Sequence, residues 1–133
     1  MKFEGAKGKE ILIVEDERAL RDALRQSLEA AGYAVRVARD GVQGVAEWER
    51  KRPDLIIMNG EMPHKNGLQA TAEIRERDSL TPIILMSAWC GFPDKIESIK
   101  RLAPRAFADF IAPNITDEEF LARIRAIVPN EES

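Results

Sequence analysis

The sequence predicts one α/β domain, built on a five-stranded doubly wound parallel sheet in the order 2-1-3-4-5 with five helices. Three short runs, at residues 11–14, 55–58 and 83–86, are apolar throughout, which is typical of strands covered on both faces. Strand and helix patterns alternate along the chain, as in parallel sheets with right-handed crossovers. The length of 133 residues is that of one domain with a substantial core.

The elements follow in order, with ends uncertain by about two to four residues. Strands are expected at residues 10–14, 34–38, 54–58, 82–86 and 106–111, and helices at 17–31, 41–51, 67–77, 93–103 and 117–128. Leu20, Leu24 and Leu28 repeat every fourth residue along one face of the first helix, and Gly32 is a helix stop. Basic residues 50–52 complement the dipole at the end of the second helix. The last helix opens with a capping-box pattern at residues 116–119.

Composition excludes several classes of function. The apolar content of 44% and charged content of 32% are ordinary for a globular domain, and the net charge of −3 comes without a basic run that would bind nucleic acid. No apolar stretch is long enough to span a membrane, and the single cysteine, Cys90, fits a reducing compartment. We therefore expect a cytoplasmic protein without nucleic-acid or membrane partners. Residues 1–9 are expected to be a flexible lead-in, residues 10–128 the domain, and residues 129–133 a short tail.

Polar side chains follow the apolar runs at the carboxyl ends of three predicted strands. Glu15 and Asp16 follow the first run, Asn59 follows the third strand, and Ser87 follows the fourth. Ligands of open α/β sheets bind beyond this edge, and acidic or amide oxygens there make a cation site. A purely structural alternative is open: Asp16 caps the first helix, Glu15 favours its dipole, and Asn59 fills a pocket.

These segments, at residues 11–16, 54–67 and 82–88, resemble in order and spacing the receiver domain of bacterial response regulators, a CheY-like, flavodoxin-like fold. The resemblance covers about residues 9–128, nearly the whole chain. It implies that Glu15 and Asp16 match the acidic pair that holds Mg²⁺, and that Ser87 matches the hydroxyl that bonds the phosphoryl group. Asn59 stands where the family has the aspartate that accepts that group, and an amide cannot attack phosphorus as a carboxylate does. The resemblance thus implies a metal set of Glu15, Asp16, Asn59 and Glu61 that is weak or empty.

The family also has a lysine shortly before the last helix, and this chain lacks it. Counting back from that helix puts Pro113 at the lysine position, whereas a shift of one residue puts Ala112 there. The family's site carries three carboxylates and one lysine, a formal −2, and Glu15 with Asp16 alone also gives −2. Losing the aspartate and the lysine together leaves no unpaired buried charge, which favours a natural degenerate receiver. Phe110 occupies the family's aromatic switch position.

The connection after Ser87 is about four residues longer than is usual for the family and carries Trp89 and Phe92. Two interpretations of these aromatic residues are open: they pack over the pocket or against the core edge, or they anchor a protein partner. The only histidine, His64, has no nucleophile placed beside it, and no nucleotide-binding motif is present.

The sequence therefore predicts a stand-alone, non-enzymatic receiver that signals by phosphorylation-independent contact with a protein, such as a sensor histidine kinase or another signalling protein. No cofactor is expected. One alternative is a phosphoryl-accepting receiver in an engineered or altered form with Asn59 in place of aspartate. A second alternative is a small-ligand sensor that uses the vacated acidic pocket.

Overall fold

Five parallel strands form one sheet in the order β2-β1-β3-β4-β5, as predicted. The computed structural model describes residues 9–130. The strands are β1 (Glu10–Val14), β2 (Ala34–Ala38), β3 (Leu55–Met58), β4 (Ile83–Met86) and β5 (Asp109–Ile111). Every residue of β3 and β4 is buried, because these central strands are covered on both faces.

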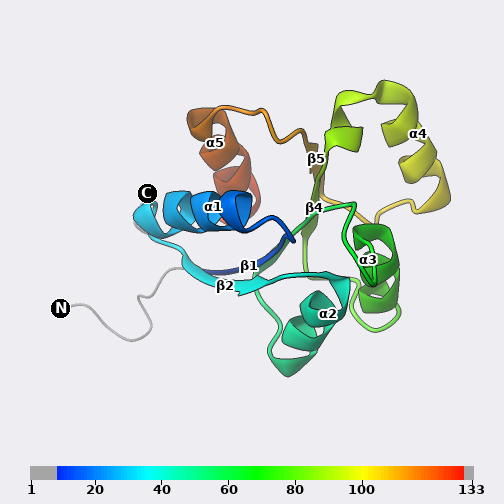
Figure 1. Ribbon diagram of the computed structural model, residues 1–133, viewed down its shortest axis with the longest axis horizontal. Helices are drawn as coiled ribbons and strands as arrows, with labels where there is room; N and C mark the ends of the chain where they lie inside the picture. The colour runs from blue at the N-terminus through cyan, green and yellow to red at the C-terminus, as the bar shows by residue number, and fades with distance from the viewer. Residues whose placement is uncertain (1–8, 131–133) are drawn as a thin grey trace.

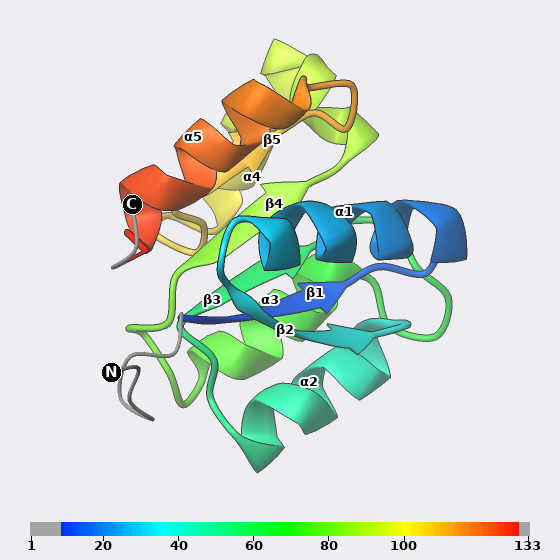
Figure 2. The ribbon, with the colours of Figure 1, turned by 90° about the vertical axis from the view of Figure 1, so that its left-hand side faces the viewer.

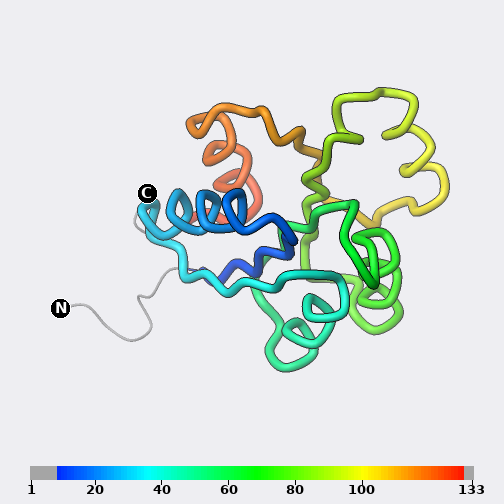
Figure 3. Tube along the Cα trace, in the orientation of Figure 1, coloured from blue at the N-terminus to red at the C-terminus, as the bar shows by residue number. Residues whose placement is uncertain are grey.

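Helices cover both faces of this sheet (Figure 1). They are α1 (Arg18–Ala30), α2 (Gly41–Arg50), α3 (Gly67–Arg75), α4 (Pro93–Leu102) and α5 (Asp117–Ile127). Figure 2 shows α1 and α5 on one side of the strands and α2 and α3 on the other. In the trace of Figure 3, α4 lies near β5, at the end of the sheet remote from β2.

The core is divided between the two faces because successive strand residues point in opposite directions. Ile11, Ile13 and Ile57 pack with Leu24 and Leu28 of α1 on the first face. On the second face, side chains of the same strands pack against α2 and α3; this cluster includes Leu12, Val14, Ile56, Met58, Val45, Trp48 and Ile74. The helices therefore hold the sheet from both sides and fix the position of its carboxyl edge.

Most of the helices begin at a residue whose side chain caps the helix. The Asp40 side chain accepts a hydrogen bond from Gln43 N at the start of α2, and Asn66 and Gln69 form a capping box at the start of α3. Thr116 Oγ1 accepts from Glu119 N, 3.1 Å away, at the predicted start of α5. The α1 helix has no side-chain cap at its N-cap residue, Glu17.

A buried polar network ties α2 to the loop after α3. The carboxylate of Asp78 is 3% exposed and accepts hydrogen bonds from Trp48 Nε1 at 2.8 Å and Thr81 Oγ1 at 2.6 Å. The backbone N–H groups of Leu80 and Thr81 donate to its other oxygen, each at 3.0 Å. A buried carboxylate is tolerated here because each oxygen has donors.

The structure differs from the prediction at three places. The last strand covers only Asp109–Ile111, and a 3₁₀ helix, η2 (Ala88–Gly91), follows β4 where no element was predicted. Asn130, expected in a short tail, is buried and donates to the carbonyl oxygen of Ala31 at 2.6 Å. It lies against Gly32, whose φ of 99° and lack of a Cβ atom permit that approach.

The expected lead-in at residues 1–9 and the expected tail at residues 129–133 lie mostly outside the described residues. Within residues 9–130, no helix has the length and apolar character that crossing a membrane requires.

Candidate functional site

The strand register brings two of the predicted site residues side by side. Val14 of β1 pairs with Met58 of β3, so that the next residues, Glu15 and Asn59, leave the sheet together. Asn59 N donates to Val14 O at 2.9 Å, and Glu15 N donates to Ala38 O at 3.0 Å. The backbone at the carboxyl edge is therefore fixed by ladder-like bonds that continue past the strand ends.

These residues line a shallow cavity of about 280 Å³ at the carboxyl edge of the sheet. The structure brings together six of the residues singled out from the sequence, namely Glu15, Asp16, Asn59, Glu61, Ser87 and Pro113. We refer to this cavity as the acidic pocket. Its position agrees with the rule that open α/β sheets place their sites beyond the strand carboxyl ends.

The side-chain amide of Asn59 connects the acidic groups of the pocket. Its Nδ2 atom lies 3.2 Å from Glu15 Oε2 and 3.0 Å from Asp16 Oδ1. The same nitrogen lies 3.0 Å from the main-chain oxygen of Glu61. All three neighbours are oxygen atoms, so the nitrogen side of the amide, which donates, must face them. The N–H groups thus supply the partial positive charge that holds the two carboxylates near each other.

Glu15 is the most buried acidic residue of the pocket, with an exposed fraction of 5%. Burial, reinforced by neighbouring Asp16, raises the pKa of Glu15 from 4.5 to about 7. Glu15 Oε2 also accepts from Glu17 N at 3.0 Å and so satisfies an N–H group at the start of α1. The prediction that Asp16 caps this helix is therefore not met, and Glu15 supplies the acceptor instead.

The arrangement does not fit a Mg²⁺ site. Magnesium takes oxygen ligands in near-octahedral geometry, whereas an amide nitrogen occupies the space between Glu15, Asp16 and the Glu61 carbonyl. A cation could reach these oxygens only by displacing that N–H group. The Glu61 side chain is exposed, and within residues 9–130 no three His, Cys, Asp or Glu side chains are grouped so as to hold a metal ion.

Ser87 also lines the acidic pocket and is 3% exposed. Its hydroxyl oxygen accepts from Trp89 N at 3.1 Å, which caps η2. This turn brings the Trp89 ring onto Gly60: a Cβ atom added at Gly60 would lie 2.5 Å from Trp89 Cζ3 and 3.0 Å from Ser87 Oγ. Only glycine permits this close approach, so Trp89 packs beside the acidic pocket.

The two aromatic residues of the long connection after Ser87 therefore have different environments. Trp89 is half-buried against Gly60, whereas Phe92, at the N-cap of α4, is 63% exposed. The packing interpretation fits Trp89, and Phe92 remains available as an anchor for a partner.

Pro113 and Ala112 occupy different surroundings. Pro113 lines the acidic pocket, whereas Ala112 lines an adjoining cavity with Cys90 and Phe110. Of the two candidate positions for the family's lysine, Pro113 is the one that faces Glu15 and Asp16, and its side chain carries no charge. The Phe110 ring lies 5.6 Å from the Phe107 ring, between centroids, and Lys100 Nζ lies 5.5 Å from its centroid.

Sequence reasoning missed two contacts of the site. The guanidinium group of Arg21 donates to the main-chain oxygen of Glu15 at 3.0 Å, bringing a cation to the acidic segment. The sequence did offer a signal for this contact, because Arg21 lies one turn into the first predicted helix and therefore near Glu15. The contact between Trp89 and Gly60 had no such signal, because it depends on the unpredicted turn η2.

Comparisons with known proteins agree with this geometry. The family model described as "Response regulator receiver domain" matches residues 11–125. Response regulator MprA of Mycobacterium leprae is 34% identical over 118 residues, which cover 89% of this chain and 50% of that protein. The chain therefore spans about half the length of the curated relatives it matches.

Solved structures give the same likeness. The signal receiver domain of a signal transduction histidine kinase from Syntrophus aciditrophicus has a TM-score of 0.77 at 28% identity, covering 90% of this chain and 89% of that one. Response regulator TrrA from Thermotoga maritima, solved in complex with Mg(2+)-BeF, has a TM-score of 0.76 at 26% identity, covering 90% and 99%. CheY4 of Vibrio cholerae, at 24% identity and a TM-score of 0.81 over 90% and 98% of the two chains, shares the fold.

Proposed function

Since this chain belongs to the response regulator receiver domain family, a component of two-component signalling, we propose that it is a receiver that signals without aspartyl phosphorylation. It acts as a non-catalytic module through contact with a protein partner. The observation that carries the proposal is the Asn59 amide, which binds Glu15 and Asp16 where a phosphoryl-accepting receiver needs a nucleophilic carboxylate and a cation.

The charge of the acidic pocket supports this proposal. Pro113 lines the pocket and offers no cation to pair with a bound anion. The raised pKa of Glu15 means that Glu15 and Asp16 together carry less than their formal charge of −2 near neutral pH. The Asn59 N–H groups partly balance what remains, so the pocket is stable without the lysine, the third carboxylate and the metal.

The partner is a protein, a sensor histidine kinase or another signalling protein. Phe92 supports this choice, because a phenylalanine that is 63% exposed beside a structured helix is the kind of side chain that anchors an interface. Phe92 is the N-cap residue of α4. It immediately precedes residues 93–128, the segment that the resemblance to receiver domains assigns to the partner surface: the fourth helix, fifth strand and fifth helix.

The direct test is incubation with acetyl phosphate and Mg²⁺, followed by intact-mass measurement. The wild-type chain should show no base-labile phosphate adduct. The matched variants are Asn59→Asp, which restores the carboxylate, and Asn59→Asp with Pro113→Lys, which also restores the cation. The double variant should acquire an adduct that the wild type lacks.

A stoichiometric adduct on the wild-type chain would refute the proposal. An adduct on Asn59→Asp alone, formed as readily as on the double variant, would instead favour the alternative of a phosphoryl-accepting receiver altered at a single position. Unfolding curves of all three proteins, measured first, ensure that the comparison is made between folded chains.

A further inference from the structure

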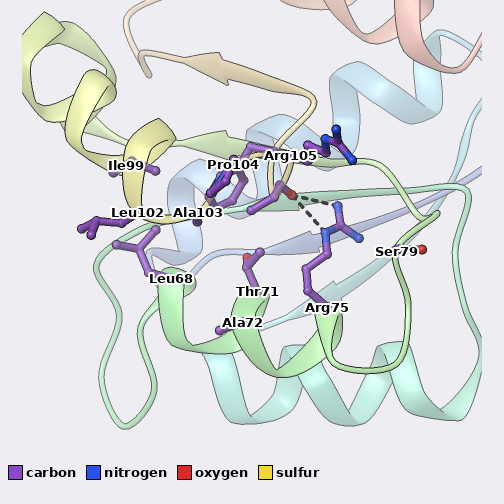
Figure 4. Close-up of a pocket in the computed structure, with 12 residues that line it drawn as sticks. Leu68, Thr71, Ala72, Arg75, Ser79, Ile99, Leu102, Ala103, Pro104 and Arg105 are labelled. Atoms are coloured by element: carbon purple, nitrogen blue, oxygen red, sulfur yellow. Dashed lines mark hydrogen bonds between the residues drawn. The ribbon is translucent and has the colours of Figure 1, made fainter.

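A second cavity, larger than the acidic pocket, lies away from it, between α3, α4 and the loop that precedes β5 (Figure 4). Its volume of about 610 Å³ is within the range of pockets that bind small molecules, roughly 300–1,000 Å³. We refer to it as the α3–α4 cavity. None of the residues that line it belongs to the acidic pocket.

The α3–α4 cavity has an apolar end and a cationic end. In Figure 4, Leu68, Ile99 and Leu102 gather at one end, and Arg75 and Arg105 lie toward the other. These two arginines are the only charged residues of the lining, although the whole chain is acidic with a net charge of −3. The cavity therefore favours a ligand with an apolar body and a negative head.

A buried hydroxyl group provides an independent sign that the cavity can receive a polar ligand atom. Thr71 is 2% exposed, and its Oγ1 atom has no hydrogen-bond partner among residues 9–130. Its side chain rises from α3 toward the cavity (Figure 4). Buried polar atoms almost always have a partner, so an oxygen or nitrogen atom of a ligand would complete this one.

Arg75 also has unused hydrogen-bonding capacity. It donates to Ala106 O from Nε and Nη2, at 3.2 and 2.8 Å, and to Asp78 O from Nη1 at 2.9 Å. A guanidinium group has five N–H donors, and these bonds use three, so two remain for a ligand. The carbonyl contacts hold the guanidinium group in place, which lowers the entropy cost of using it.

We propose that the α3–α4 cavity binds a small amphipathic carboxylate. Its hydrocarbon part lies against Leu68, Ile99 and Leu102. Its carboxylate accepts hydrogen bonds from Arg75 and from the Thr71 hydroxyl, with Arg105 adding charge at the rim. This proposal concerns a different surface from that of Asn59 and does not depend on how the acidic pocket works.

Two aromatic rings connect the ligand in the α3–α4 cavity to residues 93–128, the part of the chain that we propose as the partner surface. Phe107 lines the α3–α4 cavity, and its ring is the 5.6 Å neighbour of Phe110. Phe110 in turn contacts Lys100 of α4. A molecule between α3 and α4 therefore touches the elements that hold Phe110, which provides an input other than phosphorylation.

The test is a titration of the folded chain with octanoate, followed by the amide signals in a two-dimensional NMR spectrum. Octanoate should cause saturable shifts in α3 and in residues 99–107. The neutral analogue n-octanol should bind at least about tenfold more weakly, a difference of roughly 1.4 kcal/mol, because it lacks the charge that the arginines recognise.

Two exposed leucines give a matched pair of variants. Leu102, 84% exposed, lines the cavity, whereas Leu80, 87% exposed, does not. Leu102→Glu should weaken octanoate binding by at least about tenfold, and Leu80→Glu should leave it unchanged, because only the first puts a carboxylate beside the ligand. Asn59→Asp should bind octanoate as the wild type does.

Absence of saturable shifts, equal affinity for octanoate and n-octanol, or equal weakening by both leucine variants would overturn the proposal. Shifts in α3 and α4 that follow protein concentration instead of octanoate would also overturn it, since they would show that a second copy covers this cavity.

Discussion

The Nδ2 atom of Asn59 lies 3.0 Å from Oδ1 of Asp16, so an amide N–H group stands against an acidic side chain at the carboxyl edge of the sheet. The contact satisfies an acidic side chain with a neutral donor. It explains in physical terms how the carboxylates of Glu15 and Asp16 are held near each other, and it leads to tests that separate the acidic pocket from the rest of the fold.

We expect weak Mg²⁺ binding by the wild-type chain. The Asn59 amide is neutral and must turn away before a cation can enter, whereas Asn59→Asp adds a full negative charge. At an effective dielectric constant near 20, one charge at about 4 Å contributes up to roughly 4 kcal/mol before desolvation is counted. Isothermal titration calorimetry should show saturable binding for Asn59→Asp and none for the wild type at millimolar Mg²⁺. A submillimolar dissociation constant for the wild type would contradict this expectation.

Stability should depend on pH through Glu15. Its pKa is about 7 in the folded chain against an ordinary 4.5, so between these values the folded state holds a proton that the unfolded state has lost. The contribution of Glu15 to stability is therefore fully present below about pH 4.5 and is lost as pH rises through about 7, by up to about 3 kcal/mol. Glu15→Gln keeps an acceptor for Glu17 N and should remove this slope. Urea unfolding in EDTA from pH 4.5 to 8 measures the pH dependence of the free energy of unfolding. Glu97→Gln, at an exposed residue, is the control.

The buried carboxylate of Asp78 should have the opposite pH dependence. Burial alone would raise its pKa, but hydrogen bonds from Thr81, Trp48 and Leu80 outweigh burial and hold the pKa of Asp78 well below 3.8. Its contribution is present above about pH 3.8 and is lost as pH falls below that value.

Asp78→Ala should therefore lower the free energy of unfolding at pH 7 by about 3 kcal/mol or more, because Trp48 Nε1 and Thr81 Oγ1 lose a buried acceptor. Asp22→Ala removes a partly exposed carboxylate that pairs only with Arg18 and Arg25 of the same helix, and it serves as the control. If Trp48 fluorescence during unfolding shows equal stability for both variants, the network does not stabilise the fold.

Phe92 and Trp89 should respond differently to truncation. Trp89→Ala should lower stability by about 2 kcal/mol, because the half-buried ring packs on Gly60. Phe92→Ala should leave stability unchanged, since the ring is 63% exposed, but should weaken binding to the protein partner by at least about tenfold. Urea unfolding measures the first effect, and binding of the purified partner measures the second. Val42→Ala, at a residue 52% exposed in α2, controls for loss of an exposed apolar side chain.

The last comparison uses two buried threonines, of which only Thr81 has a hydrogen-bond partner for its hydroxyl group among residues 9–130. Thr71→Val should raise the free energy of unfolding by about 1 kcal/mol, because it replaces a buried hydroxyl that has no partner among residues 9–130. Thr81→Val should lower it by about 1–3 kcal/mol, because it removes a donor to Asp78 at 2.6 Å. Differential scanning calorimetry of both variants measures the signs. A destabilised Thr71→Val chain would show that its hydroxyl is satisfied in the folded protein.

Hydrophobic periodicity by itself determined the fold class and the approximate bounds of five strands and five helices, and the resemblance to receiver domains supplied the strand order. Those features depend on local patterns: apolar runs for buried strands, a four-residue repeat for α1, and Thr116 for the start of α5. The sequence also placed Glu15, Asp16, Asn59 and Ser87 at one edge, because parallel strands align their carboxyl ends.

The tertiary structure decided how those side chains meet. The direction of the Asn59 amide follows mainly from the carboxylates of Glu15 and Asp16, which come from a different strand end, and the pKa of Glu15 follows from burial by the whole fold. Packing also placed Pro113, and not Ala112, at the acidic pocket, and it left the Thr71 hydroxyl beside the α3–α4 cavity without a hydrogen-bond partner among residues 9–130. None of these can be predicted from a local pattern, because each depends on residues that are distant in the chain and adjacent only after folding.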